Sequence, residues 1–501
     1  MNVRSGWSLL VLAFTMAFAT DARAHSGNTI DGVYTYVIER PYQGASRRVD
    51  MITADDGHRI KLDLSAASLP PEGLAGIRNR RIRVAATDTT ARAEAMGISE
   101  NFRVRSVQVL SDIVGFSRIS AVTGNQKYIS ILCKFSDKPA VEPRTPAYFT
   151  TQLNNTYPGF NHFFREVSYN TLTLDGSQAD VAWVTLPMTR VQYNALGAPV
   201  DYLGAMFDDC TAAANATVDF SQYFGINMMF NDKVDDTSAW GGSWFSTLDG
   251  VTRSWPVTWM PYWGDGILFG WNDHGVLAHE MSHAFGSLHS KDPSGFEYGS
   301  SWDVVSNPGG TCLVTQAGVA GYGCIGQHPV AYNKIAMGIM PAARIVTHAA
   351  GANLTAYNVE RMTQPPMAGG TFQVIKAAIT GTTSQFYTIE SRKRVGYDQN
   401  VPGDGVIIHK VTTGNPQPAH LLSPLGTAAN LGDIDALWAV GSVFISVPDN
   451  IKITVNSFSG DGTANVTVQP ATDPGTFTFA LAGTTVIEGN TTAAVIAVTR
   501  T

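Results

Sequence analysis

The segment HEMSHAFGSLH, from His279 to His289, constrains this chain more than any other because its spacing places three imidazoles and one carboxylate where a single metal ion would need them. Side chains four residues apart lie one turn above each other on an α-helix, so His279 and His283 would face one point. Glu280 would lie beside that point, within reach of a water molecule and not as a ligand. The spacing predicts a helix that carries a metal site, with Glu280 as general base.

Gly286 follows His283 by three residues, and glycine allows the left-handed turn in which many helices end. The chain would then turn back and bring His289 to the same ion as a third nitrogen ligand, which leaves a fourth position open, as in catalytic zinc sites. Three imidazoles also suit cobalt, nickel or copper, so the assignment of zinc depends on the motif and not on the ligand type. The alternative is a set of buried or capping histidines without a metal, but the full pattern is rare by chance.

The residues before the motif indicate where its helix begins. Asn272 or Asp273 is available as the N-cap. His274 precedes His279 by five residues, and a rotation of about 140° takes it off the ligand face, so we expect a helix-start residue. Four other histidines lack ligand spacing and are expected to be surface or hydrogen-bonded residues: His328, His348, His409 and His420.

Four segments outside the motif add to the pattern HExxHxxGxxH. They are Tyr128–Asp137 (YISILCKFSD), Phe163–Leu174 (FFREVSYNTLTL), Glu297–Ser306 (EYGSSWDVVS) and Ser384–Lys410. Together with the motif they resemble the metzincin clan of zinc endopeptidases, and within it the gametolysin-like branch. The similar immune-inhibitor-type enzymes usually have aspartate as the third ligand, so His289 favours the gametolysin side. The resemblance implies peptide hydrolysis with one zinc ion held by His279, His283 and His289.

One residue departs from the metzincin pattern. Val305 stands where the turn beneath the metal ordinarily has methionine. That methionine forms a hydrophobic floor and is not a ligand, so an apolar valine would fill much of the same volume. The resemblance therefore still implies metal binding, while the departure bears on clan assignment and on catalytic efficiency.

The first residues predict export. Residues 1–24 carry an early positive charge at Arg4, an apolar run from Leu9 to Ala19 and a small-x-small end at Ala22 to Ala24, as in a secretory signal peptide. The alternative, a membrane anchor, would need a longer apolar run. We expect a secreted, extracellular monomer, in transit through the periplasm if bacterial, with no membrane insertion after signal removal. A net charge of −7 over 501 residues, without long basic runs, argues against nucleic acid as a partner.

Four cysteines in a secreted chain allow three pairings. Cys312 and Cys324 flank a glycine-rich loop and are expected to form a disulfide. Cys133 lies in an apolar strand and Cys210 in an expected helix, so they either pair or stay as buried thiols. A cysteine-switch role for Cys133, in which its thiolate caps the zinc, is a less favoured alternative because its neighbours are apolar.

The whole chain predicts a multidomain α+β protein, with a metzincin-like catalytic α/β domain and flanking β-rich domains of barrel or sandwich type. The expected parts are a signal peptide at 1–24, an N-terminal β-rich domain at 25–118, the catalytic domain at 119–345, a C-terminal β-rich domain at 346–470 and a partial Calx-beta-like segment at 474–501. The N-terminal domain is either a pro-region that blocks the site, which the resemblance favours, or a permanent accessory domain. Because the last segment stops short of a full repeat, the chain is expected to be a fragment or to carry an abandoned module.

Within the catalytic domain we expect strands at 128–135 and 226–230 and helices near 157–167 and 202–214, followed by the motif helix. The tryptophan-rich stretch from Trp240 to Trp271 is expected to be a loop packed over the core or, alternatively, a substrate-binding rim. Asp232, Asp235 and Asp236 are expected to form a solvated turn, with structural Ca²⁺ as the alternative. The basic run Arg78–Arg83 is expected to be a solvated strand face and not a binding site.

The leading hypothesis is a secreted zinc metalloendopeptidase that hydrolyses peptide bonds of extracellular or cell-wall proteins, with water activated by zinc and Glu280 as the base. The alternative is a catalytically inactive surface adhesion or binding protein on a metalloprotease scaffold, which Val305 and the Calx-beta-like segment keep open. A zinc hydrolase of non-peptide amides is a third reading. The cleavage-site preference is not encoded in these motifs.

Overall fold

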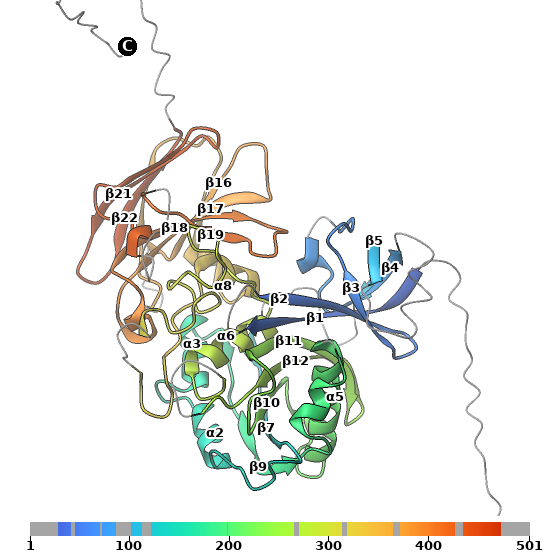
Figure 1. Ribbon diagram of the computed structural model, residues 1–501. Coiled ribbons are helices and arrows are strands. Elements are labelled where there is room, and N and C mark those ends of the chain that lie inside the picture. The colour runs from blue at the N-terminus through green and yellow to red at the C-terminus, as the bar shows by residue number, and fades with distance from the viewer. Residues whose placement is uncertain are drawn as a thin grey trace, which may run out of the picture.

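The computed structural model describes residues 29–41, 46–70, 73–86, 102–112, 122–197, 199–264, 270–312, 318–363, 371–425 and 434–471. The expected signal peptide, 1–24, and the Calx-beta-like segment, 474–501, lie outside these residues. Figure 1 shows an N-terminal β unit in blue, a central α/β unit in cyan to yellow-green and a C-terminal β unit in orange and red. The described residues form a mixed α+β protein with more strand than helix, as the sequence predicts.

The N-terminal unit is a five-stranded sheet that closes on itself. Its elements are β1 (Thr29–Pro41), β2 (Arg47–Ala54), β3 (Arg59–Asp63), the 3₁₀ turn η1 (Gly73–Gly76), β4 (Arg80–Ala86) and β5 (Phe102–Asp112). β1 pairs with β2 along most of its length and with β4 at its start, while β5 pairs with β3 and β4. Tyr34, Tyr36 and Ile38 alternate along β1 and pack into the small core, with the period of two that a strand requires. The β-rich expectation for this unit is confirmed.

The central unit has a mixed sheet with helices on both faces. The strands of this sheet are β7 (Tyr128–Lys134), β9 (Gln178–Thr185), β10 (Gly225–Phe230), β11 (Thr237–Leu248) and β12 (Val251–Met260), while β6 (Gly124–Asn125) and β8 (Leu172–Thr173) pair in a separate two-stranded sheet. Its helices are α2 (Pro146–Gln152), α3 (Phe160–Val167), α4 (Arg190–Asn194), α5 (Pro199–Ala214), η2 (Phe220–Gln222), α6 (His274–Ala284) and α8 (Ala331–Met337). β9, β7, β10 and β12 run parallel, and β11 is antiparallel to β12.

Packing against helices explains why the central strands are apolar throughout. Every residue of β7 and β10 is buried, as expected of parallel strands covered on both faces. The cluster on one face includes residues of α5, and the cluster on the other includes residues of α3 and α6. The strand and helix predictions for this unit are confirmed. α3 begins at Phe160 and not at Tyr157, because its N-cap Gly159 has a non-helical ψ of 154° and because the residue before a proline, here Tyr157, is disfavoured in a helix.

The tryptophan-rich stretch is mostly a β-hairpin, so the prediction of a loop is wrong for residues 240–259. In the register of β11 and β12, Trp240 lies opposite Trp259 and Trp244 opposite Trp255. All four rings are buried in the core, on the face covered by α5. The chain turns at Asp249-Gly250, where both residues have positive φ, the conformation that two-residue hairpin turns need. The tryptophans of each strand are four residues apart, an even number, so both side chains of a strand lie on the same face of the sheet.

The N-terminal and central units share one sheet. Residues Val37 to Pro41 of β1 pair antiparallel with β11, so the strand order is β2-β3-β5-β4-β1-β11-β12-β10-β7-β9. Val37, Val49 and Met51 also belong to the same apolar cluster as Trp244. Figure 1 shows the long β1–β2 hairpin reaching from the N-terminal unit to α6 and β11. The two units are therefore joined through main-chain hydrogen bonds and a common core.

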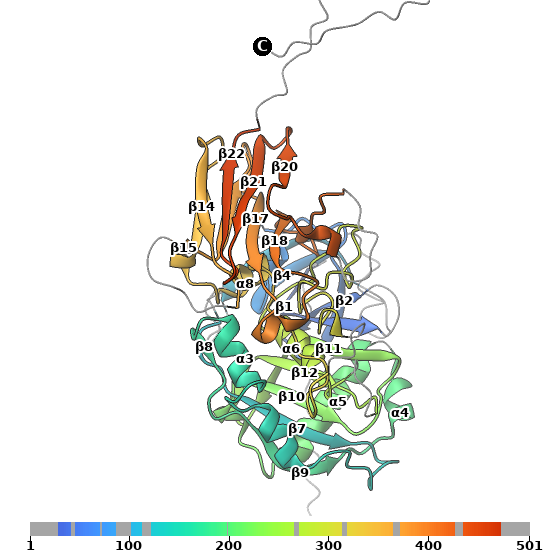
Figure 2. The same ribbon diagram turned by 90° about the vertical axis from the view of Figure 1, so that its left-hand side faces the viewer.

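The C-terminal unit, seen in Figure 2, consists of two five-stranded sheets. Its elements are η3 (Ala342–Arg344), β13 (Ile345–His348), β14 (Thr355–Val359), β15 (Thr371–Phe372), β16 (Val374–Ala378), β17 (Gln385–Arg392), η4 (Gly396–Asn400), β18 (Gly405–Thr412), β19 (Ala419–Leu421), η5 (Ile434–Ala436), β20 (Val443–Ser446), β21 (Ile451–Phe458) and β22 (Ala464–Gln469). One sheet has the order β13-β16-β17-β18-β19 and the other β15-β14-β22-β21-β20. Their facing side chains form one apolar core, which confirms the β-rich expectation for this unit.

A buried ionic cluster joins the C-terminal unit to the central one. The guanidinium of Arg392 bonds Asp398 at 2.7 and 2.8 Å and Glu390 at 3.2 Å, and all three side chains are fully buried. The Glu390 carboxylate also accepts the backbone N–H of Ala331, the first residue of α8. Burial raises the pKa of Glu390 to about 7, although Arg392 opposes this shift. The cluster thus fixes the start of α8 against β17.

The scattered histidines contribute to packing and hydrogen bonding. In the ionic cluster, His328 is buried and lies 2.7 Å from Lys334 and 3.2 Å from Glu166. His348 bonds the hydroxyl of Tyr357, and His409 is fully buried in β18. The expectation of surface or hydrogen-bonded residues therefore holds for His328, His348 and His420, whose Nε2 lies 3.4 Å from the carbonyl of Pro293. It is wrong for His409, because neither of its buried ring nitrogens has a hydrogen-bond partner among the described residues.

Candidate metal centre

α6 begins and packs as its sequence predicts. The carboxylate of Asp273 accepts the backbone N–H of Val276 at 3.2 Å, so Asp273 is the N-cap. Every residue of the helix is buried, including Glu280. A Cβ atom on Gly241 of β11 would lie 2.3 Å from the carbonyl oxygen of Glu280, so a glycine is needed where the strand approaches the helix. Glu280 is therefore held at the junction of α6 with the sheet.

The chain reverses directly after α6. Gly286 has a φ of +103°, a conformation that side chains with a Cβ rarely adopt. The N–H of Gly286 donates to the carbonyl of His283 at 2.8 Å, and the N–H of Ser287 donates to that of Ser282 at 2.9 Å. These bonds close the helix end and bring His289 back toward the helix, as the glycine predicts.

The reversal also receives a side chain from the N-terminal unit. A Cβ on Gly286 would lie 1.1 Å from Nη1 of Arg78, and this nitrogen donates to the carbonyl of Phe285 at 3.3 Å. The expectation of a solvated basic face is therefore wrong for Arg78, which is half-buried against the turn. It holds better for Arg83, an exposed residue that pairs with Asp31. No periodicity in the sequence distinguishes these arginines, because the difference arises from a contact over 207 residues.

The three predicted ligands meet at one point. Nε2 of His283 lies 3.0 Å from Nε2 of both His279 and His289, and the latter two atoms are 3.1 Å apart. The residues are 0%, 1% and 2% exposed for His279, His283 and His289. Their ligand atoms are close enough together to hold one metal ion, and no other such group of His, Cys, Asp or Glu side chains occurs among the described residues.

The other nitrogen of each ring is occupied by an acceptor. Nδ1 of His279 donates to the carbonyl of Val304 at 2.7 Å, and Nδ1 of His283 donates to that of Ser287 at 2.9 Å. Nδ1 of His289 donates to Oε2 of Glu297 at 3.2 Å. Because carbonyls accept hydrogen bonds and do not donate them, these partners place the proton on Nδ1 and leave the Nε2 lone pairs facing one another.

This donor set fits a divalent metal ion. Ligand nitrogens at about 2.05 Å from a tetrahedral ion would be roughly 3.3 Å apart, close to the observed spacing. Three converging lone pairs in a buried site repel one another unless a cation lies between them, since burial removes the water that would otherwise solvate them. The residues present therefore suit an ion such as Zn²⁺, although imidazoles alone do not determine which metal binds.

The segment from Glu297 to Ser306 lies at the triad, where the resemblance expects the turn beneath the metal. Val304 provides the carbonyl that orients His279, and Val305 is fully buried in an apolar cluster with Met281. Tyr298 lies against the triad, with its ring centroid 4.7 Å from that of His289. Its hydroxyl donates to the carbonyl of Glu39 on β1 at 3.2 Å.

The sequence did not single out Glu297 and Tyr298 as site residues. They belong to a segment matched only by resemblance, and no regular spacing relates them to the histidines. A loop position eight residues after His289 can lie anywhere until the loop is folded. The only available signal was their nearness to the third ligand.

The aspartates considered for calcium are not gathered into a ligand group among the described residues. Asp232 forms an ion pair with Lys138 at 2.6 Å, and Asp235 accepts a hydrogen bond from Tyr202 at 2.7 Å. The carboxylate of Asp232 is therefore neutralised by a lysine, and that of Asp235 is hydrogen-bonded to a tyrosine of α5. The structure gives no support to Ca²⁺ at these residues.

The cysteines form two disulfides, Cys133–Cys210 and Cys312–Cys324. The second pair was predicted, and the first was one of two alternatives. A cysteine switch at Cys133 is wrong, because its sulfur is bonded to Cys210 and cannot provide a thiolate. Two disulfides fit the oxidising environment of a secreted protein. In the part of the chain that the structure describes, no helix is both long and apolar enough to cross a membrane.

His274 is a helix-start residue, as predicted, and it requires the neutral imidazole. Its ring is stacked 4.4 Å from that of Phe160, and its Nδ1 accepts the N–H of Gly326 at 3.1 Å. Burial lowers the pKa of His274 to about 3. Between pH 6.5 and 3 the unfolded chain therefore binds a proton that the folded chain does not, so acidification lowers the free energy of unfolding.

We predict that His274→Asn reduces this acid sensitivity. Asparagine retains an acceptor for the N–H of Gly326 and does not ionise. The slope of unfolding free energy against pH below 6.5 should be smaller by up to about 1.4 kcal/mol per pH unit. Urea unfolding of metal-free protein at several pH values, followed by tryptophan fluorescence, measures this slope without a contribution from metal release. Equal slopes for variant and wild type would contradict the assignment.

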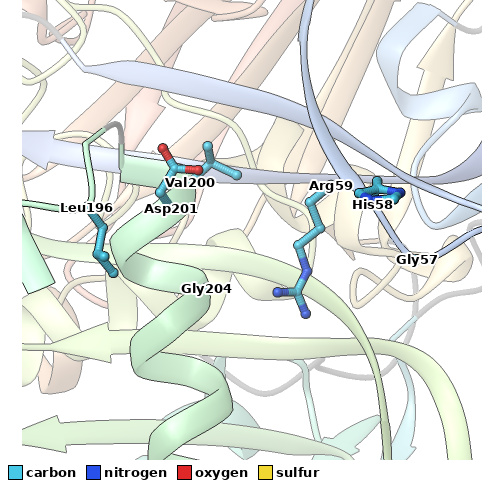
Figure 3. Close-up of a pocket in the computed structure, with 7 residues that line it drawn as sticks. All are labelled: Gly57, His58, Arg59, Leu196, Val200, Asp201 and Gly204. Carbon is cyan, nitrogen blue, oxygen red and sulfur yellow. The ribbon is translucent and has the colours of Figure 1, made fainter. Parts of the chain in front are cut away.

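A surface pocket of about 420 Å³ lies apart from the triad, between the N-terminal unit and α5 (Figure 3). It is lined by Gly57, His58, Arg59, Leu196, Val200, Asp201 and Gly204. Arg59 forms an ion pair with Asp208 at 3.1 Å and lies 4.8 Å from the ring of Trp244. The pocket contains none of the three histidines, so it is separate from the candidate metal centre.

No protein-family model and no curated protein matches this sequence. The candidate functional residues are therefore identified by their chemistry: three oriented, buried imidazoles and, next to His279 in the same buried helix, the carboxylate-bearing Glu280. The expected metzincin and gametolysin resemblance remains a hypothesis.

Proposed function

We propose that this protein is a secreted zinc-dependent metalloendopeptidase. The observation that carries the proposal is the convergence of three buried Nε2 atoms at 3.0–3.1 Å, each on a ring whose Nδ1 is fixed by an acceptor. Glu280 follows the first of these histidines on the same buried helix. The resemblance of the motif to gametolysin-like metzincins supports peptide bonds as the target and His279, His283 and His289 as the ligands.

The residues of the chain have distinct roles in this reaction. A bound zinc ion would supply Lewis acidity that activates water and polarises the scissile carbonyl. Glu280 accepts the proton of the attacking water and then transfers it to the nitrogen of the leaving amine. The acceptors of the Nδ1 protons, Val304, Ser287 and Glu297, keep the three rings in one orientation during the reaction. Burial excludes bulk water from these groups and strengthens their electrostatic effects.

We propose extracellular or cell-wall proteins as substrates, since the disulfides and the expected signal peptide fit secretion. The competing proposal is an inactive adhesion or binding protein on a metalloprotease scaffold, which Val305 and the two-sheet C-terminal unit favour. The presence of Glu280 together with all three histidines argues against a decayed site. Hydrolysis of a non-peptide amide is the third candidate.

The N-terminal unit contacts the site directly. The hydroxyl of Tyr36 donates to the carbonyl of His283 at 3.2 Å, and Tyr298 bonds Glu39. Leu288, between the turn and the third ligand, packs against the N-terminal core. The described part of the N-terminal unit therefore lies against the metal loop. We propose that this unit is a pro-region, as the resemblance favours; a permanent accessory domain, which the sheet shared by β1 and β11 also fits, is the alternative.

Metal removal tests the proposed function. We expect the purified protein to contain zinc and to hydrolyse peptides from casein or from a peptide library. A chelator such as 1,10-phenanthroline should abolish hydrolysis, and added Zn²⁺ should restore it, because without the ion the site has no Lewis acid. Mass spectrometry of the products reports activity, cleavage preference and N-terminal processing together. A zinc-containing protein that cleaves no peptide, even after the chain is cut between the N-terminal and central units, would instead support the binding protein.

A further inference from the structure

Glu297 distinguishes one ligand of the triad from the other two. Its side chain is buried, and its Oε2 accepts the Nδ1–H of His289 at 3.2 Å. Nδ1 of His279 and of His283 instead donates to a neutral backbone carbonyl. His289 is therefore the ligand whose outer partner carries a formal negative charge.

A charged acceptor changes what the imidazole can do. Hydrogen bonds to a carboxylate are roughly twice as strong as those between neutral groups, so Glu297 fixes the tautomer and the ring orientation of His289 more firmly than a carbonyl would. The negative charge also increases the electron density that the ring can donate through Nε2. Both effects favour a cation at the point where the three Nε2 atoms meet.

The Glu297 carboxylate accepts three further hydrogen bonds, from two residues. Ser46 donates to it twice, from its N–H to Oε1 at 2.5 Å and from its hydroxyl to Oε2 at 2.6 Å. Gln417 donates its side-chain N–H to Oε2 at 2.9 Å. Ser46 directly precedes β2 in the N-terminal unit, and Gln417 lies between β18 and β19 in the C-terminal unit. The carboxylate is thus oriented by both flanking units while it orients a residue of the central one.

We infer that Glu297 is a positioning residue for the metal centre: it holds His289 in the ligating orientation, and Ser46 and Gln417 hold Glu297. This inference rests on the proposed metal centre and adds a residue that acts on it through His289. It makes the affinity for the metal depend on contacts from the N-terminal and C-terminal units. A purely structural role, in which Glu297 only ties the β1–β2 hairpin to the loop, would leave metal affinity unchanged in folded protein.

The test measures the zinc affinity of the full-length chain by competition with a chromogenic chelator. Glu297→Gln retains an oxygen acceptor of similar size and removes the charge, and we expect a 10- to 100-fold loss of affinity, typical of outer-shell partners. Glu297→Ala should lose at least as much. Ser46→Ala and Gln417→Ala leave the charge in place and should each have a smaller effect. Glu360→Gln, a buried glutamate of the C-terminal unit that accepts a bond from Thr371, is the matched control and should bind zinc as the wild type does.

Cobalt substitution gives a second measurement, because the visible spectrum of bound Co²⁺ reports the geometry of its ligands. We expect Glu297→Gln to alter this spectrum and Glu360→Gln to leave it unchanged. Wild-type zinc affinity together with a wild-type cobalt spectrum in folded Glu297→Gln would overturn the positioning role while leaving the metal centre intact. A wild-type chain that takes up neither metal would instead overturn the proposed centre, and the role of Glu297 with it. Neither measurement depends on peptide hydrolysis, so failure of the positioning role can be distinguished from failure of the proposed metal centre.

Discussion

Glu280→Gln is expected to retain the metal and to reduce peptide hydrolysis by about 10²- to 10⁴-fold, the usual contribution of a general base. Glutamine has nearly the same size and shape as glutamate, so it should fit the buried position on α6. Its amide cannot accept the proton of the attacking water. The loss should appear mainly in kcat, because the metal ligands are unchanged and Glu280 acts only during the reaction.

The measurement combines kcat and KM on a casein-derived peptide with the zinc content of the same sample. His283→Ala is the companion variant, since removal of a ligand should release the metal and abolish hydrolysis together. Retention of zinc separates the loss of a base from the loss of the site. If Glu280→Gln hydrolysed the peptide at the wild-type rate, the proposed mechanism would be wrong.

Arg392→Met is expected to lower the free energy of unfolding by about 3–5 kcal/mol, the cost of removing one partner from a buried ion pair. Asp398 and Glu390 would both lose their hydrogen bonds to the guanidinium and remain fully buried. Methionine fills much of the vacated volume, so a cavity should contribute less to the loss than the unpaired charge. The start of α8, which depends on Glu390, should be destabilised with the cluster.

Urea unfolding of both proteins at pH 7.5 provides the measurement. Arg394→Met is the matched control, because Arg394 is largely exposed and its pairing with Asp404 at 3.4 Å should contribute at most about 1 kcal/mol. Adding Glu390→Gln and Asp398→Asn to Arg392→Met should recover part of the lost stability, since the buried charges are then absent. Equal losses for Arg392→Met and Arg394→Met would show that the buried cluster is not a special source of stability.

The local features of the metal helix could be predicted because each depends on residues close together in the sequence. The capping carboxylate of Asp273, the spacing from His279 to His283 and the turn at Gly286 lie within fourteen residues, and the structure agrees with all of them. The tryptophans of the hairpin are spaced by four residues, at 240 and 244 and at 255 and 259, and this spacing fits one face of a strand and also one face of a helix. The spacing alone therefore does not predict the hairpin, and the many glycine and aromatic residues favour the interpretation of a loop.

Other features depend on contacts between distant segments and could not be predicted. Ser46 lies 251 residues from Glu297, and Gln417 lies 120 residues from it on the other side. A single sequence does not reveal such contacts, because neither periodicity nor a turn preference links the segments. The same reason applies to the pairing of β1 with β11, whose partners are separated by about two hundred residues. Thus the ligands were predictable, and the residues that orient them were not.

Because the two units share a sheet, the N-terminal unit can dissociate from the central unit only if β1 separates from β11. If β1 separated from β11, the margin of the central sheet would expose a row of unsatisfied N–H and C=O groups, which is a template for another extended chain. Any incoming polypeptide must displace a tethered competitor whose effective concentration is far above that of a free molecule. Cleavage of the chain between the two units would make β1 and the other polypeptide compete as separate molecules. Their concentrations would then determine which chain pairs with the edge strand β11.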